Sequence, residues 1–242
     1  MKQTALITGA SKRIGKALTE HLAEKGWNIA IHFNSSEKLA FELVKSLSIK
    51  YPNQKFASFK TNLADISEVA QLVPNVVSTF GGIDLLVNNA SVFDASYVKE
   101  TAEELFDSQI NVNLKAPFFL TRDFANHCKT GNIVNFVDTR ITSNKSNFAA
   151  YSISKKALWE LTKMAALELS PAIRVNAIAP GVTLPPEEKD EKYLQNLAQN
   201  IPMKKPGGLE PIIRSLDFVL ENKHLTGQLL FADGGENLGI NA

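Results

Sequence analysis

The stretch ALITGASKRIG, residues 5–15, decides the fold of this chain. It opens with three apolar residues, as a buried strand does, and a helix pattern starts within its last residues. Gly9 lets the chain turn sharply off the strand, and Gly15 lets the helix pack closely on a sheet. The free N–H groups at the start of such a helix suit a pyrophosphate. A glycine-rich turn in this place therefore predicts a dinucleotide-binding site.

The rest of the chain repeats this alternation of a short apolar run and a longer amphipathic stretch. Repetition at this spacing predicts a doubly wound α/β domain, with a parallel sheet and helices on both faces. The expected strands are residues 5–7, 29–31, 56–59, 84–87, 133–137, 174–178 and 229–231. The expected helices are residues 14–25, 37–50, 67–80, 103–126 and 149–169.

Prolines modify this pattern in two places. Pro74 predicts either a kink in the third helix or a boundary placed wrongly. Between Pro180 and Pro211 the strand rhythm is lost, and so long a loop in a compact domain is usually functional. We expect a single domain, residues 1–242, with a loop or helix insertion at about residues 181–210 that covers the substrate.

Composition and charge exclude several classes of protein. Of the 242 residues, 44% are hydrophobic and 21% are charged, as in a globular domain rather than a disordered or fibrous one. The net charge of +1 gives no reason to expect nucleic acid or an anionic membrane as a partner. Cys128 is the only cysteine, which fits a reducing compartment. Neither a signal-peptide pattern nor a run of ~20 apolar residues is visible, so a cytoplasmic protein is expected.

The end of the second expected strand bears on the choice of cofactor. A carboxylate there would hold a ribose 2′-hydroxyl and repel a 2′-phosphate. The sequence instead reads HFNSS at residues 32–36, with no acid before Glu37. Hydroxyls, an amide and the nearby cations Lys12 and Arg13 suit a phosphate, although a merely solvated turn is an alternative. The pattern favours NADP(H).

The chemical end of the expected site is the segment YSISK, residues 151–155, at the start of a helix pattern. Residues four apart share a helical face, so Tyr151 and Lys155 are expected to project into one pocket. A phenol with a pKa of ~10 is a poor acid–base group at neutral pH. The nearby ammonium is expected to lower that pKa toward a useful range for a general acid.

Taken in order, the motifs resemble those of the short-chain dehydrogenase/reductase family over essentially the whole chain. They are Thr8-Gly9 to Gly15, Asn88-Asn89-Ala90, Asn113, Tyr151 with Lys155, Pro180-Gly181 and Asp233-Gly234-Gly235. The resemblance implies a Rossmann-type domain with a seven-stranded parallel sheet, assembled into homotetramers. It also implies that Lys155 holds the nicotinamide ribose and tunes Tyr151, and that Asn113 orders the water of a proton relay. The predicted cofactor-binding residues are Gly9, Ser11, Lys12, Arg13, Ile14, Gly15, His32, Asn34, Ser35, Ser36, Asn62, Leu63, Asn89, Ala90, Ser91, Tyr151, Lys155, Pro180, Gly181, Val182 and Thr183.

Four positions depart from the family pattern, and they point to one branch of it. They are Arg13 for the middle glycine, Asn62 for an acid, Ser91 for a glycine, and Asp138 for the catalytic serine. With KRIG at residues 12–15 and NNASVF at residues 88–93, the combination resembles the pteridine reductases, including the bacterial dihydromonapterin reductases.

This closer resemblance implies roles for the departing residues. Phe93 would sandwich a flat pterin against the nicotinamide, Ser91 would hydrogen-bond the pterin, and Arg13 would bridge the pterin and a cofactor phosphate. The implied catalytic residues are Tyr151, Lys155, Asp138 and Asn113, and the implied substrate-binding residues are Arg13, Ser91, Phe93, Asp138, Tyr151 and Leu184.

Physical reasoning agrees with a pterin but leaves alternatives open. A pterin is planar and rich in N–H donors, so an aromatic face and a carboxylate form a sensible cradle. Reduction of a C=N bond needs a hydride on carbon and a proton on nitrogen, and Asp138 could deliver that proton or orient the ring. Alternatively, Phe93 is a core aromatic, Asp138 is an ion-pair partner of Arg140, and Arg13 only solvates its turn.

The leading hypothesis is NADPH-dependent reduction of a dihydropterin such as dihydromonapterin or dihydrobiopterin, with weaker activity on dihydrofolate. No metal-ligand spacing is present, and this chemistry needs no metal. One alternative is a general carbonyl reductase acting on 3-oxoacyl substrates, which Asp138 disfavours because a carboxylate is a poor partner for a carbonyl oxygen. Another is a non-catalytic NADP(H)-binding sensor, which would be expected to lack Tyr151 or Lys155. The region of residues 183–200 is expected to select the pterin side chain.

Overall fold

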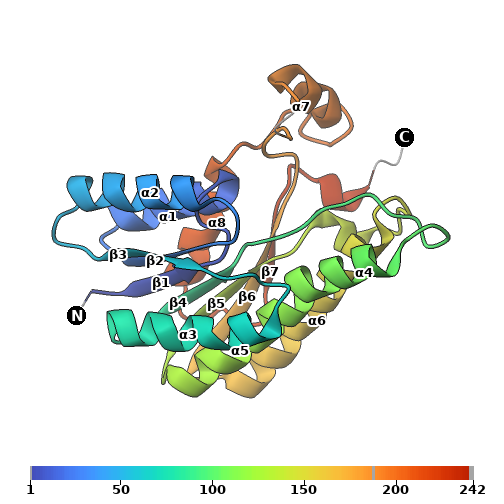
Figure 1. The fold of residues 1–242 in the computed structure, drawn as a ribbon. Coiled ribbons are helices and arrows are strands. Elements are labelled where there is room, and N and C mark those ends of the chain that lie inside the picture. Colours follow the sequence, from blue (N-terminus) through green and yellow to red (C-terminus); the bar gives the residue numbers. More distant parts are fainter. Residues whose placement is uncertain (1, 187–188, 240–242) are drawn as a thin grey trace.

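The structure is a computed structural model that describes residues 2–186 and 189–239. Within these residues, seven strands form one sheet in the order β3-β2-β1-β4-β5-β6-β7, and every neighbouring pair is parallel (Figure 1). The strand order reverses between β1 and β4, where α/β sheets of this kind bind ligands. The strands are β1 (Thr4–Ile7), β2 (Asn28–Phe33), β3 (Phe56–Lys60), β4 (Leu85–Asn88), β5 (Gly131–Phe136), β6 (Ile173–Pro180) and β7 (Leu229–Ala232).

Helices cover both faces of this sheet, which confirms the predicted fold class. Side chains of α1, α2 and α8 share one buried cluster with the sheet, and those of α3, α5 and α6 share another on the opposite face (Figure 1). The helices are α1 (Arg13–Glu24), α2 (Glu37–Lys50), α3 (Ile66–Phe80), α4 (Glu103–Ile110), α5 (Ala116–His127), α6 (Ala149–Leu169), α7 (Glu191–Ala198) and α8 (Glu210–Glu221). Shorter turns are the π-helix η1 (Asn111–Lys115) and the 3₁₀ turns η2 (Thr139–Thr142) and η3 (Glu236–Leu238).

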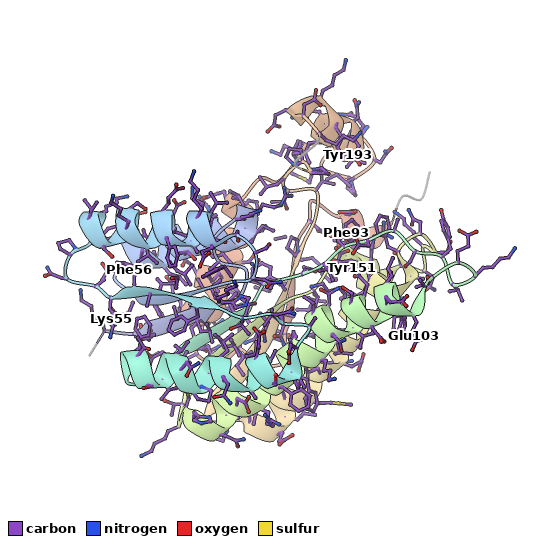
Figure 2. The ribbon with its side chains drawn as sticks, viewed as in Figure 1. Lys55, Phe56, Phe93, Glu103, Tyr151 and Tyr193 are labelled. Carbon is purple, nitrogen blue, oxygen red and sulfur yellow. The ribbon has the colours of Figure 1, made fainter. Side chains whose placement is uncertain are left out.

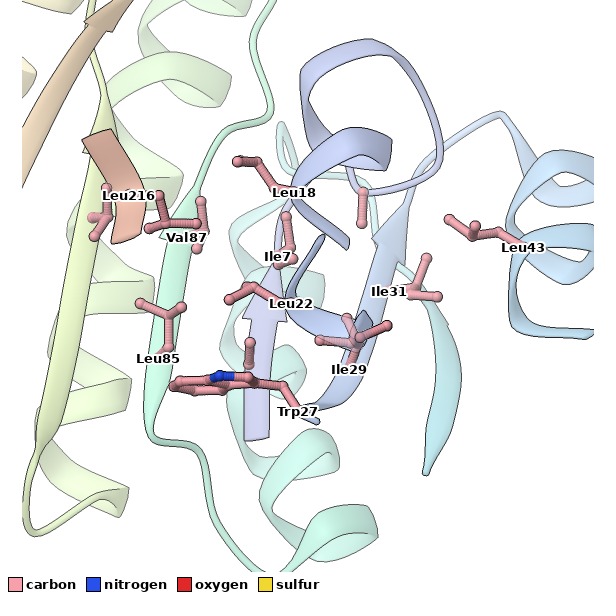
Figure 3. Close-up of a cluster of buried hydrophobic side chains, with 14 of the residues drawn as sticks. Ile7, Leu18, Leu22, Trp27, Ile29, Ile31, Leu43, Leu85, Val87 and Leu216 are labelled. Atoms are coloured by element: carbon pink, nitrogen blue, oxygen red, sulfur yellow. The ribbon is translucent and has the colours of Figure 1, made fainter. Parts of the chain in front are cut away.

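The core explains why the first strand is apolar from Ala5 to Ile7. Ile7 packs with Leu18 and Leu22 of α1 on one face (Figure 3), whereas Leu6 packs into the cluster on the other. All four side chains are at most 1% exposed. Burial of such a side chain contributes about 1.5–3 kcal/mol, so a strand buried on both faces is strongly favoured at the centre of the sheet. This packing fixes where the glycine turn after β1 begins.

Two helices differ in detail from the prediction. α3 continues through Pro74, with Asp65 accepting from the Ser67 N–H at its start and Gly81 in a left-handed conformation at its end. The alternative of a misplaced boundary at Pro74 is therefore wrong. The single helix expected at residues 103–126 is instead α4, η1 and α5 in succession, because a π-helical turn interrupts it at residues 111–115. Such turns occur often at functional sites.

The segment expected at about residues 181–210 leaves the layers of the sheet and carries α7, which projects beyond the carboxyl ends of the strands (Figure 1). Its base is tied down, since the Gly207 N–H donates to the Val182 carbonyl at 3.0 Å and the Met203 N–H donates to the Gly234 carbonyl at 3.1 Å. That it covers a substrate stays a prediction.

Across the described ranges, the helices lack the combination of length and apolar character that crossing a membrane requires.

Candidate active site

The candidate site lies where the strand order reverses, and hydrogen bonds lock the loops after β1 and β4 together. The Thr8 hydroxyl accepts from the N–H groups of Asn89 at 2.9 Å and Ala90 at 3.0 Å. In return, the Asn89 amide donates to the carbonyls of Thr8 at 2.8 Å and Gly9 at 3.2 Å. The glycine turn after β1 and the Asn-Asn-Ala motif after β4 are therefore bonded to each other at one side of the site.

The turn between β1 and α1 requires its glycines. Gly9 has a φ of +63°, which glycine adopts without strain. A Cβ atom at Gly15 would lie 2.0 Å from the Gly9 carbonyl oxygen, so α1 approaches the turn more closely than any side chain permits. Lys12, the N-cap residue of α1, makes no side-chain cap to the helix. The first N–H groups of α1 are thus left for an anion, as the pyrophosphate prediction requires.

Arg13 connects this turn to the start of the insertion. Its guanidinium donates to the carbonyl of Pro185 at 2.8 Å and to that of Leu184 at 3.3 Å. The alternative that Arg13 only solvates the turn is therefore wrong. Its backbone φ is +50°, in the left-handed region that favours glycine, so the arginine is held in place against local strain. This is the position at which the related pattern has glycine.

We expect Arg13→Gly to be more stable than Arg13→Ala by about 1 kcal/mol, because only alanine retains the strain of a positive φ. Both variants lose the same contacts to Leu184 and Pro185, so their difference isolates the backbone. Urea unfolding of the two variants under identical conditions measures it. Equal or greater stability of the alanine variant would contradict a left-handed backbone at this position.

Of the predicted cofactor-binding residues, Ser11 lies in the turn after β1, Asn34, Ser35 and Ser36 follow β2, and Asn62 and Leu63 follow β3. The hydroxyls of Ser11 and Ser36 are 2.7 Å apart, and Asn34 and Ser35, next to Ser36 in the sequence, are exposed. Asn62 is also exposed, and its side-chain oxygen accepts from the Ala64 N–H at 3.1 Å. Leu63 is buried. Their contacts with a cofactor stay a prediction.

His32 is a correction to the predicted cofactor site. Its Nδ1 accepts from the Gly9 N–H and its Nε2 donates to the Thr61 carbonyl, each at 3.0 Å. The side chain is only 2% exposed, and this burial lowers its pKa to about 4. Because both ring nitrogens are bonded to the backbone, the imidazole offers no donor to a phosphate. His32 instead positions the glycine turn.

This burial predicts a pH dependence of stability. The folded pKa of His32 lies below its unfolded value of 6.5, so as the pH falls the unfolded chain takes up the proton first. The free energy of unfolding should fall by about 2 kcal/mol between about pH 7 and pH 5 through this residue alone. Urea unfolding of His32→Gln should show a shallower pH dependence, while the exposed control His224→Gln should match the wild type. Equal slopes in all three proteins would contradict the assignment.

The chemical end of the site is built from α6 and the end of β5. The Tyr151 hydroxyl donates to Oδ2 of Asp138 at 2.8 Å, and Lys155 Nζ donates to the Phe136 carbonyl at 2.8 Å. Tyr151 is 5% exposed and Lys155 is 2% exposed. Asp138 also accepts from the Arg140 backbone N–H at 2.8 Å, and this caps η2. The phenol and the ammonium thus lie on one helical face, 5.7 Å apart from ring centre to Nζ.

The electrostatics of this pair differ from the expectation. Burial raises the pKa of Tyr151 well above its usual value, and the carboxylate of Asp138 raises it further. Ser91 and Arg140 act in the opposite direction, and Lys155 is not among the causes. Burial lowers the pKa of Lys155 to about 8. The prediction that Lys155 lowers the pKa of Tyr151 is therefore wrong here, and Tyr151 holds its proton at neutral pH.

Asn113 lies in the π-helical turn η1 and is fully buried. Its side chain is occupied within the protein, accepting from the Ser91 hydroxyl and the Val92 N–H at 3.0 Å each. It donates to Val92, Gln109 and Ser154. Asn113 therefore fixes the segment that carries Ser91, while its role in ordering water stays a prediction.

Phe93 is not a core residue, since its side chain is 53% exposed. Figure 2 shows it beside Tyr151. The two ring centres are 4.6 Å apart in an edge-on arrangement, and the other partner of Phe93 is Phe148, stacked parallel at 4.1 Å. The sequence interpretation missed Phe148, whose only signal was its place three residues before Tyr151.

A cavity joins the two ends of the site. On one side of the cavity the backbone at Gly181 packs against Asp233 so closely that only glycine fits, because a Cβ atom there would lie 2.5 Å from the Cα of Asp233. Thr183 lines the cavity whereas the predicted Val182 does not, and Phe136 and Val137 are lining residues that the sequence interpretation missed. The lining residues are Arg13, Ile14, Asn89, Ser91, Phe136, Val137, Asp138, Tyr151, Lys155, Pro180, Gly181, Thr183 and Leu184.

Comparison with known proteins agrees with this geometry. A family model described as short chain dehydrogenase matches residues 3–194. FolM alternative dihydrofolate reductase 1 from Brucella canis, solved in complex with NADP, is 33% identical with a TM-score of 0.92, and the match covers 99% of this chain and 96% of that one. The FolM protein from Brucella suis, also with NADP, is 33% identical with a TM-score of 0.93, over 99% of this chain and 97% of that one. The 3-oxoacyl-(acyl-carrier-protein) reductase FabG of Staphylococcus epidermidis is 32% identical over 97% of this chain and 99% of its own length. The chain therefore belongs to the short-chain dehydrogenase family.

Proposed function

We propose that this protein is an NADPH-dependent reductase of a pterin, converting a dihydropterin to a tetrahydropterin. The observation that carries the proposal is the 2.8 Å hydrogen bond from Tyr151 to Asp138, beside the exposed ring of Phe93. A carboxylate in this place can accept from the N–H groups of a flat heterocycle, and an aromatic ring can cover its face. The two similar Brucella proteins, named as alternative dihydrofolate reductases, support the same chemistry.

The residues present fit NADPH. The uncapped start of α1 suits the pyrophosphate, and Lys12 and Arg13 with the hydroxyls of Ser11 and Ser36 suit a 2′-phosphate. Lys155 uses one of its three donors on Phe136, so the others can hold the hydroxyls of a ribose. When bound, NADPH supplies the hydride.

The proton comes from the chain itself. The phenol of Tyr151 carries its proton at neutral pH and can donate it to a ring nitrogen as the C=N bond is reduced. Its raised pKa makes it a weak acid, so the transfer relies on the charge of the neighbouring Lys155 ammonium to stabilise the phenolate that is left. Asp138 aligns the hydroxyl, and its carboxylate can accept from the amino group of the pterin. Ser91 stands beside this pair, 3.0 Å from the Oδ1 of Asn113. In this proposal Tyr151 is the general acid and Asp138 orients both partners.

A 3-oxoacyl reductase is the second candidate, favoured by the FabG relatives at 32% identity. The Tyr151–Asp138 pair argues against it, because an ionised carboxylate repels the negative charge that develops on a carbonyl oxygen during reduction.

NADPH oxidation measured with dihydromonapterin, dihydrobiopterin, dihydrofolate and acetoacetyl thioesters separates these functions. We expect turnover with the pterins. Turnover of the thioesters alone would overturn the proposal, and tight NADPH binding without turnover of any compound would favour a non-catalytic sensor. A Tyr51→Phe variant, altered outside the site, serves as the control and should turn over the same substrates as the wild type.

A further inference from the structure

Arg140 lies beside the candidate site, and its one role in the sequence interpretation was as an alternative ion-pair partner of Asp138. It follows Asp138 by two residues in η2, and its backbone N–H donates to that carboxylate at 2.8 Å. Its guanidinium points elsewhere, lying 4.7 Å from the ring centre of Phe148 and 5.9 Å from that of Phe93. The Asp138–Arg140 ion pair considered as an alternative is therefore not the arrangement observed.

The stacked rings beside Arg140 are positioned by the backbone of Phe148. Phe148 has a φ of 114°, a strained conformation for an aromatic residue, and this places its ring parallel to Phe93 at 4.1 Å. The strain is maintained by Ser96, whose carbonyl accepts from the N–H groups of Phe148 at 2.8 Å and Ala149 at 2.9 Å. Strain held by surrounding bonds in this way is typical of residues that position a ligand.

The guanidinium itself has donors to spare. Its one hydrogen bond to a side chain is from Nη1 to the amide oxygen of Asn147, at 3.2 Å. Among residues 2–186 and 189–239, none of the carboxylates lies within ion-pair distance of the Arg140 guanidinium. A planar guanidinium beside an aromatic stack, with donors that the protein does not use, is well suited to bind a carboxylate through two hydrogen bonds.

The position of Arg140 relative to the reacting groups indicates which carboxylate this is. Phe93 neighbours both Tyr151 and Arg140, since its ring centre is 4.6 Å from that of Tyr151 and 5.9 Å from the guanidinium carbon. A flat ring held by Tyr151 and Asp138 would extend its side chain past Phe93 and Phe148. An acidic group at the end of that side chain would meet Arg140.

We propose that Arg140 is a specificity-determining residue that binds the carboxylate of an acidic side chain on the substrate ring. The preferred substrate is then a pterin with an acidic side chain, as in dihydrofolate, rather than one with a neutral hydroxylated side chain. This inference rests on the proposed function and reverses the expectation from the sequence that dihydrofolate is the weaker substrate.

The test compares KM and kcat for dihydrofolate and dihydrobiopterin in the wild type, Arg140→Gln and Arg140→Lys. We expect Arg140→Gln to raise KM for dihydrofolate by about tenfold and Arg140→Lys by less, since lysine keeps the charge but loses the paired donors. The KM for dihydrobiopterin should stay within about twofold, because its side chain carries no carboxylate for the guanidinium. The kcat for the two pterins should change by the same factor in Arg140→Gln, because the charge of Arg140 acts on the pKa of Tyr151 whichever pterin is bound. Arg214→Gln removes an exposed arginine on α8 and serves as the matched control.

Ionic strength provides a second readout that a purely structural role would not move. Salt should raise the wild-type KM for dihydrofolate, leave that for dihydrobiopterin unchanged, and have little effect on Arg140→Gln. Equal changes in KM for both pterins in Arg140→Gln would overturn the inference and show that Arg140 only supports the aromatic stack. Turnover of acetoacetyl thioesters without turnover of either pterin would overturn the proposed function and the inference with it.

Discussion

Replacing Tyr151 by phenylalanine is expected to lower kcat for pterin reduction by about 10²–10⁴-fold, the contribution of a positioned general acid. The change removes one oxygen atom, which donates to Asp138 at 2.8 Å in the wild type. Phenylalanine fills the same buried space beside Phe93, so the fold of α6 should be retained. The affinity for NADPH should change by less than about threefold, because Lys155 and the glycine turn are untouched.

Single-turnover reduction and NADPH fluorescence titration measure the two effects separately. Tyr51→Phe, at the end of α2, loses the same hydroxyl group outside the site and should behave as the wild type. Retention of most of the activity in Tyr151→Phe would show that another group donates the proton. A parallel loss of NADPH affinity would show instead that Tyr151 acts by holding the cofactor.

The sheet and most of its helices could be predicted because their determinants are local. α2 and α6 have the bounds expected from the sequence, at residues 37–50 and 149–169. The helix expected at residues 103–126 could not be predicted in detail. The π-helical turn η1 contains Asn113, whose side chain donates to Val92, Gln109 and Ser154. Val92 and Ser154 lie 21 and 41 residues away in the chain, so the local sequence does not reveal these contacts.

The site shows the same limit more clearly. A histidine after β2 suits a phosphate by its chemistry, but the partners that occupy both nitrogens of His32 lie 23 and 29 residues away. The pKa of Tyr151 was expected to fall because Lys155 is four residues away on one helical face. Burial and the carboxylate of Asp138 raise this pKa instead. The spacing of two residues on a helix predicts neither how deeply a side chain is buried nor which third side chain contacts it.

Asp138→Ser should change which substrate the enzyme reduces while leaving its capacity for hydride transfer intact. Serine keeps an oxygen that can cap η2 and bond Tyr151, so the local backbone should hold. It lacks the charge that accepts from the N–H groups of a pterin, and losing a charge-assisted pair of this kind should lower kcat/KM for dihydropterins by about 10²-fold. NADPH affinity should stay within about twofold, because Asp138 bonds Tyr151 and the Arg140 N–H while Lys155 Nζ bonds the Phe136 carbonyl, and the charge of Asp138 acts on Lys155 only through its effect on the pKa.

The same variant should gain activity on acetoacetyl thioesters, because a neutral hydroxyl can donate to the oxygen that becomes negative during carbonyl reduction whereas a carboxylate repels it. The ratio of kcat/KM for the two substrate classes, measured in wild type and variant, is the decisive quantity. Asp138→Asn provides the matched control, since it removes the charge but keeps the size of the side chain. If Asp138→Ser loses NADPH affinity and pterin turnover to the same extent, the carboxylate is structural. If it loses only pterin turnover, the charge selects the substrate while Tyr151 and Lys155 serve the hydride-transfer chemistry common to both classes.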